Sequence, residues 1–110
     1  MLFTHIVVLT AALLALPVAA QVSTPEFDLT IKDHKFEPAE LHVPAGQKFK
    51  LVVKNMDKSA AEFESKPLKR EKVIQGGASA TILLGPLKAG SYPFVEEYHE
   101  DVTKGVIIAK

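Results

Sequence analysis

The chain has 110 residues, a length typical of one domain, and it contains no cysteine, 13 basic and 13 acidic side chains. Without cysteine the chain cannot form a disulfide, a thiolate site for zinc or copper, an iron–sulfur cluster or a cysteine nucleophile. The balanced charge argues against nucleic-acid binding, because a protein that neutralises phosphates needs an excess of basic side chains.

The N-terminal segment has the pattern of a secretory signal peptide. Residues 1–20 contain no Lys, Arg, Asp or Glu, and an apolar run at 6–16 is followed by Pro17 and by small residues up to Ala20. This pattern predicts cleavage after Ala20, which leaves residues 21–110 as a periplasmic protein with no direct membrane insertion. The alternative is a retained membrane anchor, although the apolar run is shorter than the roughly 20 residues that span a bilayer.

Beyond the signal, apolar residues recur at every second position, which is the pattern of half-buried β-strands. In residues 27–31 and 49–54 apolar side chains alternate with polar and charged ones. Further short runs rich in Val, Ile, Leu and aromatic residues follow, separated by glycine and proline turns, at 72–75, 80–84, 92–95 and 105–109. No stretch of ten residues keeps a helical stripe. We therefore predict a single all-β domain, a Greek-key sandwich or small barrel, over residues 27–110 after a short segment at 21–26.

The loop after residue 95 carries the densest chemical signal of the chain. The next residue on the same strand face as Phe94 is Glu96, so the alternation that buries this ring also points a carboxylate inward. A buried carboxylate requires a partner or an ion. Residues 96–101 contain four acids and His99. Taken alone, this loop fits a solvated turn better than a metal site.

The alternating pattern does not decide the roles of two further candidates, Glu62 and His34. Glu62 and Glu64 flank Phe63, so both carboxylates lie on the opposite face or at the rim if Phe63 packs inward. This alternation does not decide whether Glu62 reaches Glu96. His34 ends the first predicted strand; it either faces the same end of the fold as the last loop or bonds a neighbouring strand.

Several segments together resemble the cupredoxin framework. They are residues 38–49 (PAELHVPAGQKF), 51–55 (LVVKN) and 90–94 (GSYPF), with Gly105 before the final strand. Within the cupredoxin superfamily the chain is most similar to the EfeO-type domains, which are exported proteins associated with bacterial iron uptake. This second resemblance is carried by residues 33–38 (DHKFEP), 62–65 (EFES) and 70–74 (REKVI). The resemblance implies a cupredoxin-like β-sandwich.

The resemblance also implies a metal site with altered ligands. Carried over by position, the first His of a blue copper site falls on Glu62, the Cys on Glu96 and the Met on Thr103, while the second His stays as His99. Carboxylates and imidazole favour Cu(II), Fe(II) or Fe(III) over Cu(I), which argues against blue-copper electron transfer. We predict copper or iron binding through Glu62, Glu96 and His99, with His34 and Glu97 as further candidates.

The expected function follows from the EfeO-type resemblance. It implies binding, delivery or assisted oxidation of ferrous iron in the periplasm, with a second periplasmic iron-binding protein and an Ftr-type iron permease as partners. Two alternatives stay open: a metal-free β-sandwich interaction module, using the acidic loop or the basic stretch at 66–72, and a periplasmic copper carrier. The sequence has no Gly-rich phosphate loop, Gly-x-Ser-x-Gly elbow or His-Glu-x-x-His motif. Metal-assisted oxidation of ferrous iron is therefore the only enzymatic activity that we keep as a hypothesis.

Overall fold

The computed structural model describes residues 2–15 and 23–110, and the cleavage site predicted after Ala20 lies outside these ranges. Residues 2–15 form neither helix nor strand. Among the described residues, no helix is long and apolar enough to cross a membrane.

The remainder of the described chain forms strands joined by short turns. In chain order they are β1 (Glu26–Lys32), β2 (Lys35–Glu37), β3 (Glu40–Val43), β4 (Phe49–Asn55), β5 (Ala61–Ser65), β6 (Arg70–Ile74), β7 (Ser79–Leu84), β8 (Gly90–Glu96) and β9 (Lys104–Ala109), with the 3-10 turn η1 (Glu97–His99) between the last two.

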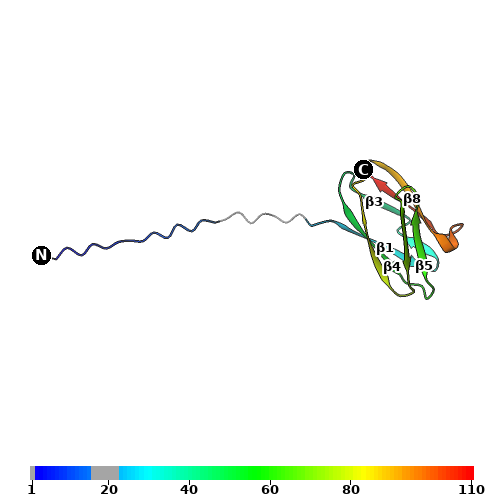
Figure 1. Ribbon diagram of the computed structural model, residues 1–110, viewed down its shortest axis with the longest axis horizontal. Coiled ribbons are helices and arrows are strands. Elements are labelled where there is room, and N and C mark those ends of the chain that lie inside the picture. Colours follow the sequence, from blue (N-terminus) through cyan, green and yellow to red (C-terminus); the bar gives the residue numbers. More distant parts are fainter. Residues whose placement is uncertain (1, 16–22) are drawn as a thin grey trace.

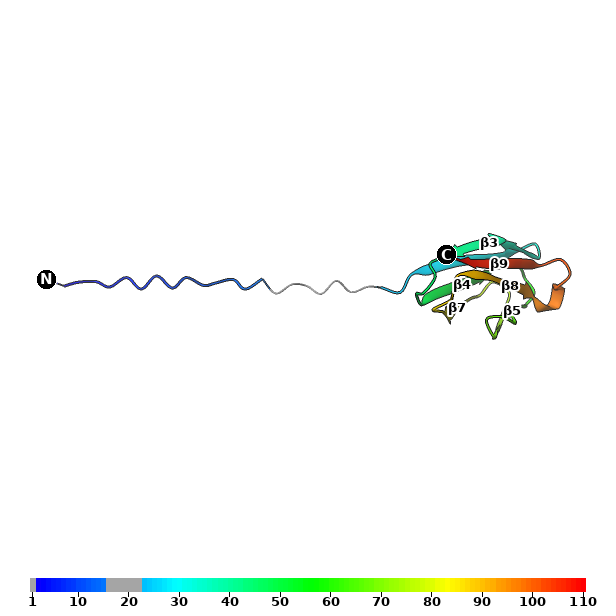
Figure 2. The same cartoon turned by 90° about the horizontal axis from the view of Figure 1, so that it is seen from above.

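Two sheets face each other and confirm the predicted all-β, single-domain sandwich (Figures 1 and 2). One has the strand order β2-β1-β4-β7 and the other β3-β9-β8-β5-β6. The pairs β1–β4 and β3–β9 are parallel, whereas the other pairs are antiparallel. Each predicted strand run overlaps an observed strand, but the alternation missed β2, β3 and β5, which have only three to five residues each.

The core lies between the sheets and consists of the apolar residues of the alternating pattern. Leu29 and Ile31 of β1 and Leu51 and Val53 of β4 are almost fully buried, while Lys32 and Lys54, which follow them, face solvent. Burial of one such side chain contributes about 1.5–3 kcal/mol, so the predicted alternation also sets which face of each strand packs inward.

Phe94 is the aromatic centre of this core. Its ring packs edge-on against Phe36, with centroids 4.8 Å apart, and lies 5.2 Å from the ring of Phe63. Gly105 makes room for it, because a Cβ at that position would lie 2.4 Å from Cζ of Phe94. This aromatic cluster underlies the end of β8, where the candidate site begins.

The β1–β2 turn and the β8–β9 segment meet at one end of the sandwich, which we call the loop pole. It comprises residues 33–34, Asp57 after β4, and residues 96–103. Figure 2 shows the segment around η1 at the end of the sandwich opposite the C-terminus. A hydrogen bond from Thr103 Oγ1 to the carbonyl oxygen of His34 joins the two turns.

Candidate metal site

Glu96 ends β8 with its side chain directed into the sandwich, as the alternation of that strand predicts. The residue is 2% exposed, and it pairs in register with the fully buried Phe63 of β5. A carboxylate at this depth is stable only when polar groups replace the water that it has lost.

Three donors satisfy the Glu96 carboxylate. Oε1 accepts the backbone N–H of Glu62 at 2.8 Å and that of Tyr98 at 3.1 Å, and Oε2 lies 2.6 Å from Nδ1 of His99. Among the described residues, no buried side-chain nitrogen or oxygen lacks a hydrogen-bond partner. A buried carboxylate requires polar partners, and for Glu96 these are His99 and two backbone N–H groups. The burial of Glu96 therefore needs no metal ion.

This contact selects the tautomer of His99. An ionised carboxylate only accepts hydrogen bonds, so Nδ1 of His99 carries the proton that it donates to Glu96. Nε2 of the neutral ring then has a free lone pair. The side chain of His99 is 40% exposed, so the ring is accessible from solvent.

Backbone hydrogen bonds close the loop around His99. The carbonyl oxygen of His99 accepts the N–H groups of Val102 and Thr103, and the N–H of Glu96 donates to the carbonyl of Thr103. Thr103, at the position that the resemblance assigns to an axial Met, is fully buried. The acidic loop is thus an ordered turn, and residues 97–102 of it are exposed to solvent.

His34 lies beside His99 at the loop pole. The two ring centroids are 4.3 Å apart, with an angle of 38° between the ring planes. Both residues of the β1–β2 turn have positive φ values, 51° for Asp33 and 56° for His34. Of the two readings left open for His34, the structure therefore favours the one that places it at the same end as the last loop.

Asp57 holds the β1–β2 turn, a role that the sequence patterns do not reveal. Its Oδ1 accepts the N–H of Asp33 at 2.7 Å, and its Oδ2 accepts the N–H of His34 at 3.0 Å and lies 3.9 Å from Nδ1 of that ring. The hydrogen bond from the His34 N–H is the main cause that lowers the pKa of Asp57, against the effect of partial burial, and the hydrogen bond from the Asp33 N–H acts in the same direction.

Asn55 in turn orients Asp57. Its Oδ1 accepts the N–H of Asp57, and its Nδ2 donates to the carbonyl oxygens of Ser59 and Ile74. Asn55 is 1% exposed, so its side chain forms these bonds in a buried setting where hydrogen bonds are electrostatically stronger than in water. An Asn two residues before an Asp, at the end of a strand, is the one signal in the sequence that points to this arrangement.

Glu62 and Glu97 form a separate group on the outer face of the second sheet. Phe63 packs inward, so the side chain of Glu62 points outward, and only its backbone N–H contacts Glu96. Carboxylate oxygens of Glu62, Glu97 and the unpredicted Glu71 lie within 4.8 Å of one another. The single site expected from the resemblance is thus divided between the two faces of the sheet.

Close approach of these acids has an electrostatic consequence. A hydrogen bond between the Glu62 and Glu97 carboxyl groups, followed by desolvation and the negative charge of neighbouring acids, raises the pKa of Glu97 to about 7. The sequence does not place Glu71 here, because its position depends on the pairing of β6 with β5.

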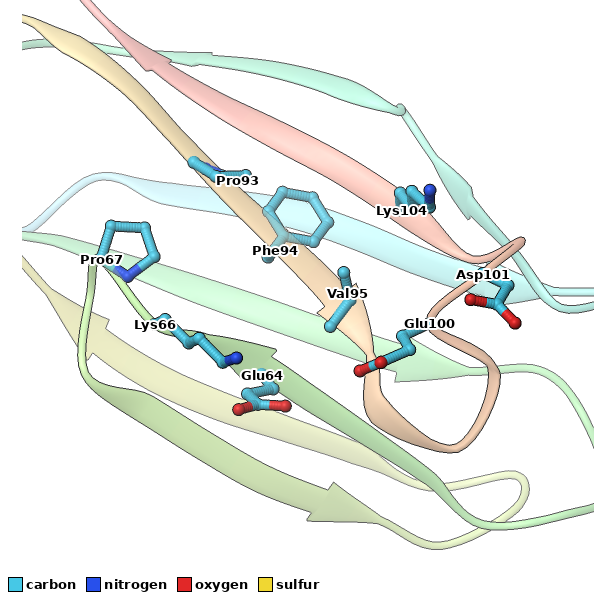
Figure 3. Close-up of a pocket in the computed structure, with 9 residues that line it drawn as sticks. All are labelled: Glu64, Lys66, Pro67, Pro93, Phe94, Val95, Glu100, Asp101 and Lys104. Atoms are coloured by element: carbon cyan, nitrogen blue, oxygen red, sulfur yellow. The ribbon is translucent and has the colours of Figure 1, made fainter.

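An open groove of about 370 Å³ borders this face but contains none of the histidines (Figure 3). It lies where β5 and β8 separate, since these strands pair only at Phe63–Glu96 and Glu64–Val95. Ser65 Oγ donates to the carbonyl of Pro93 beyond that point. The groove has an apolar floor and walls of both charges, lined by Glu64, Lys66, Pro67, Pro93, Phe94, Val95, Glu100, Asp101 and Lys104.

The arrangement fits an imidazole and carboxylate site and does not fit a blue copper site. The Cys position of the resemblance is filled by Glu96, and the Met position by Thr103, whose hydroxyl is bonded to His34. Neither residue supplies sulfur. Two neighbouring imidazoles are suited to Cu(II) and other borderline ions.

Comparisons with known proteins agree with this fold. Residues 5–109 match the family described as the cupredoxin-like domain. Over 83 residues the chain is 43% identical to the uncharacterized protein RP394 of Rickettsia prowazekii, a match that covers 76% of this chain and 66% of that protein, slightly less than two thirds of its length.

Solved structures with a similar fold include several copper proteins. Auracyanin A, a "blue" copper protein of Chloroflexus aurantiacus, superposes with a TM-score of 0.69 at 14% identity, over 80% of this chain and all of that one. The metal-binding domain of the Cu(I)-exporting P-type ATPase CopA of Streptococcus pneumoniae, solved with Cu(I), gives a TM-score of 0.65 at 15% identity, over 77% of this chain and 84% of that one. At these identities the likeness shows the fold alone. With the family match over residues 5–109, the chain belongs to the cupredoxin-like domain family.

Proposed function

We propose that the protein binds Cu(II) at the loop pole through Nε2 of His99 and Nε2 of His34. The observation that carries this proposal is the pair of neighbouring imidazoles, each with a carboxylate at its Nδ1 side: Glu96 for His99 and Asp57 for His34. A carboxylate behind a histidine is the usual setting of a metal-ligating imidazole, because it fixes the ring and raises the basicity of the other nitrogen.

In this proposal Glu96 orients His99 and does not itself bind the metal. Both of its oxygens already accept hydrogen bonds, and the side chain is buried behind the imidazole. The copper named in the descriptions of auracyanin A and of the CopA domain supports copper as the metal, although those sites are described for those proteins only.

Iron handling is the second candidate, and the outer carboxylate group favours it. Glu62, Glu71 and Glu97 offer only hard oxygen ligands, and such ligands stabilise Fe(III) relative to softer ions. The EfeO-type resemblance supports the same role. In this second function the protein binds or delivers iron for an Ftr-type permease, together with another periplasmic iron-binding protein.

Both candidates place the protein in the periplasm, with the signal peptide removed after Ala20. The mass and N-terminal sequence of the protein recovered from a periplasmic fraction test this step. A mature N-terminus at Gln21 supports it, whereas an intact N-terminus in the membrane fraction supports the retained anchor.

Metal titration by calorimetry separates the functions. Cu(II) is expected to bind with one-to-one stoichiometry, and the H34A/H99A double variant is expected to lose this binding. H42A is the matched control, because His42 is exposed on β3, where it lies 3.8 Å from Glu40. Unchanged Cu(II) affinity in H34A/H99A would overturn the copper site.

A second titration tests the carboxylate group with iron. If iron binds there, E62Q/E97Q loses Fe(III) affinity while H34A/H99A keeps it. The control is E26Q, since Glu26 is exposed on β1 and pairs with Lys50. A protein that binds neither metal under these conditions supports the interaction module instead. Loss of the gene lowers cellular iron accumulation only if the iron function is correct.

A further inference from the structure

The β1–β2 turn holds His34 in a backbone conformation that its side chain disfavours. Lys32 pairs with Lys35, so Asp33 and His34 form a two-residue hairpin loop, and both have φ between 51° and 56°. Positive φ at both central residues is the signature of a type I′ turn, in which Asn-Gly is strongly preferred. Here the second position, where glycine is favoured, carries an imidazole.

Contacts from two other segments hold this turn. Asp57, just after β4, accepts both backbone N–H groups of the turn, and Thr103, just before β9, donates to the carbonyl of His34. Asp57 is itself fixed through its own N–H by the buried Asn55. A strained residue that is held from both sides in this way marks a position where side-chain placement has been favoured over turn stability.

We propose that Asp57 is a positioning residue for metal binding: it holds the β1–β2 turn so that the ring of His34 stays beside that of His99 and both present Nε2 to one ion. This inference rests on the proposed copper function and deepens it. Asp57 acts through His34 and does not bind the metal, because its two oxygens accept the turn N–H groups.

The geometry explains why a carboxylate is needed here. Two N–H groups point at one side chain from adjacent residues, and a carboxylate offers one oxygen to each. An Asn at position 57 has a single acceptor and would direct its NH₂ group at one of the two donors. The same carboxylate also lies 3.9 Å from Nδ1 of His34, where its negative charge stabilises a cationic or metal-bound ring.

The first measurement needs no metal. In the full chain, NMR is expected to show a proton–proton NOE between the rings of His34 and His99, whose centroids are 4.3 Å apart. We expect D57N to lose this NOE while the core resonances stay unchanged. D28N is the matched control, because Asp28 is exposed and pairs with Lys54 only at 3.9 Å. An inter-ring NOE that persists in D57N overturns the positioning role.

The second measurement uses Cu(II) as the probe. We expect D57N to lower Cu(II) affinity by about tenfold, within the range found when the partner of a ligating histidine is removed, and to give the EPR spectrum of H34A with one nitrogen ligand fewer. Wild-type affinity and spectrum in D57N, together with an altered spectrum in H34A, overturn the inference but keep the copper site. An H34A variant with unchanged Cu(II) binding overturns the copper site, and the NOE then still decides the role of Asp57.

Discussion

Oε2 of Glu96 lies 2.6 Å from Nδ1 of His99, and this contact links the buried end of β8 to the solvent-exposed loop. The carboxylate is on the inner side of the ring, so the free nitrogen faces outward. A position that holds a thiolate ligand in blue copper proteins, according to the resemblance, here holds the group that orients the imidazole of His99. The residue at the Cys position thus positions His99, and neither Glu96 nor Thr103 supplies a sulfur atom.

The first prediction concerns Glu96→Gln. The amide keeps one oxygen for the N–H groups of Glu62 and Tyr98 but turns its NH₂ toward His99, so Nδ1 must accept and Nε2 must carry the proton. We expect Cu(II) affinity to fall about tenfold or more. The free energy of unfolding is expected to fall by about 1–3 kcal/mol, because a charged hydrogen bond is lost.

Calorimetry and urea unfolding measure these two effects separately. E100Q is the control, since Glu100 follows η1 on the same loop and is exposed. A folded E96Q variant with the Cu(II) affinity of the native chain would contradict the orienting role.

Much of this arrangement can be predicted from residue alternation. The same period of two that buries Phe94 places Glu96 inward, and the density of acids around His99 marks the loop as chemically unusual. The alternation also indicates that the side chain of Glu62 lies on the face of β5 opposite to Phe63, and the structure agrees. These statements depend on residues within one strand, where side-chain direction follows directly from sequence position.

The parts that could not be predicted depend on contacts between distant segments. Glu71 approaches Glu62 only because β6 pairs with β5 in one register, with Glu62 opposite Val73. Asp57 reaches the β1–β2 turn across 23 and 24 residues of sequence. No periodicity within a strand encodes such contacts, since they are set by strand register and by how distant segments pack together.

The second prediction is a pH dependence of stability due to Glu97. Its pKa is raised from 4.5 to about 7 in the folded protein, first by the hydrogen bond with Glu62. Between these two values the folded state binds more protons than the unfolded state, so stability falls as the pH rises through this window. The contribution is fully present below about pH 4.5 and is lost above about pH 7.

Urea midpoints measured from pH 5 to pH 8 test this prediction. We expect E97Q to show a smaller decrease in midpoint than the native chain, because a neutral amide at position 97 does not repel Glu62 at high pH. E26Q, with its substitution on β1, is expected to follow the native curve. An E97Q curve as steep as the native one would exclude Glu97 as the source of the pH dependence.

The third prediction concerns the contact between Gly105 and Phe94. A Cβ at position 105 would lie 2.4 Å from the ring and 3.0 Å from the carbonyl oxygen of Ala39, so G105A forces the ring or the strand to move. We expect a loss of about 1–3 kcal/mol in the free energy of unfolding, as for other overpacked cores.

A double-mutant cycle with F94L checks the cause. The smaller side chain leaves room for the added methyl group, so G105A is expected to be less destabilising in the F94L background than in the native chain. Additive effects of the two substitutions would mean that the clash with Phe94 is not the reason for the glycine.

The last prediction separates turn stability from metal binding at His34. Both H34A and H34G remove the imidazole, but glycine tolerates the φ of 56° at this position and alanine does not. We therefore expect H34G to be more stable than H34A by about 1 kcal/mol. Both variants are expected to lose Cu(II) affinity equally, because the lost ligand is the same. Thermal unfolding and Cu(II) titration measure the two properties, and a Cu(II) affinity that tracks turn stability instead would show that His34 acts only through the backbone.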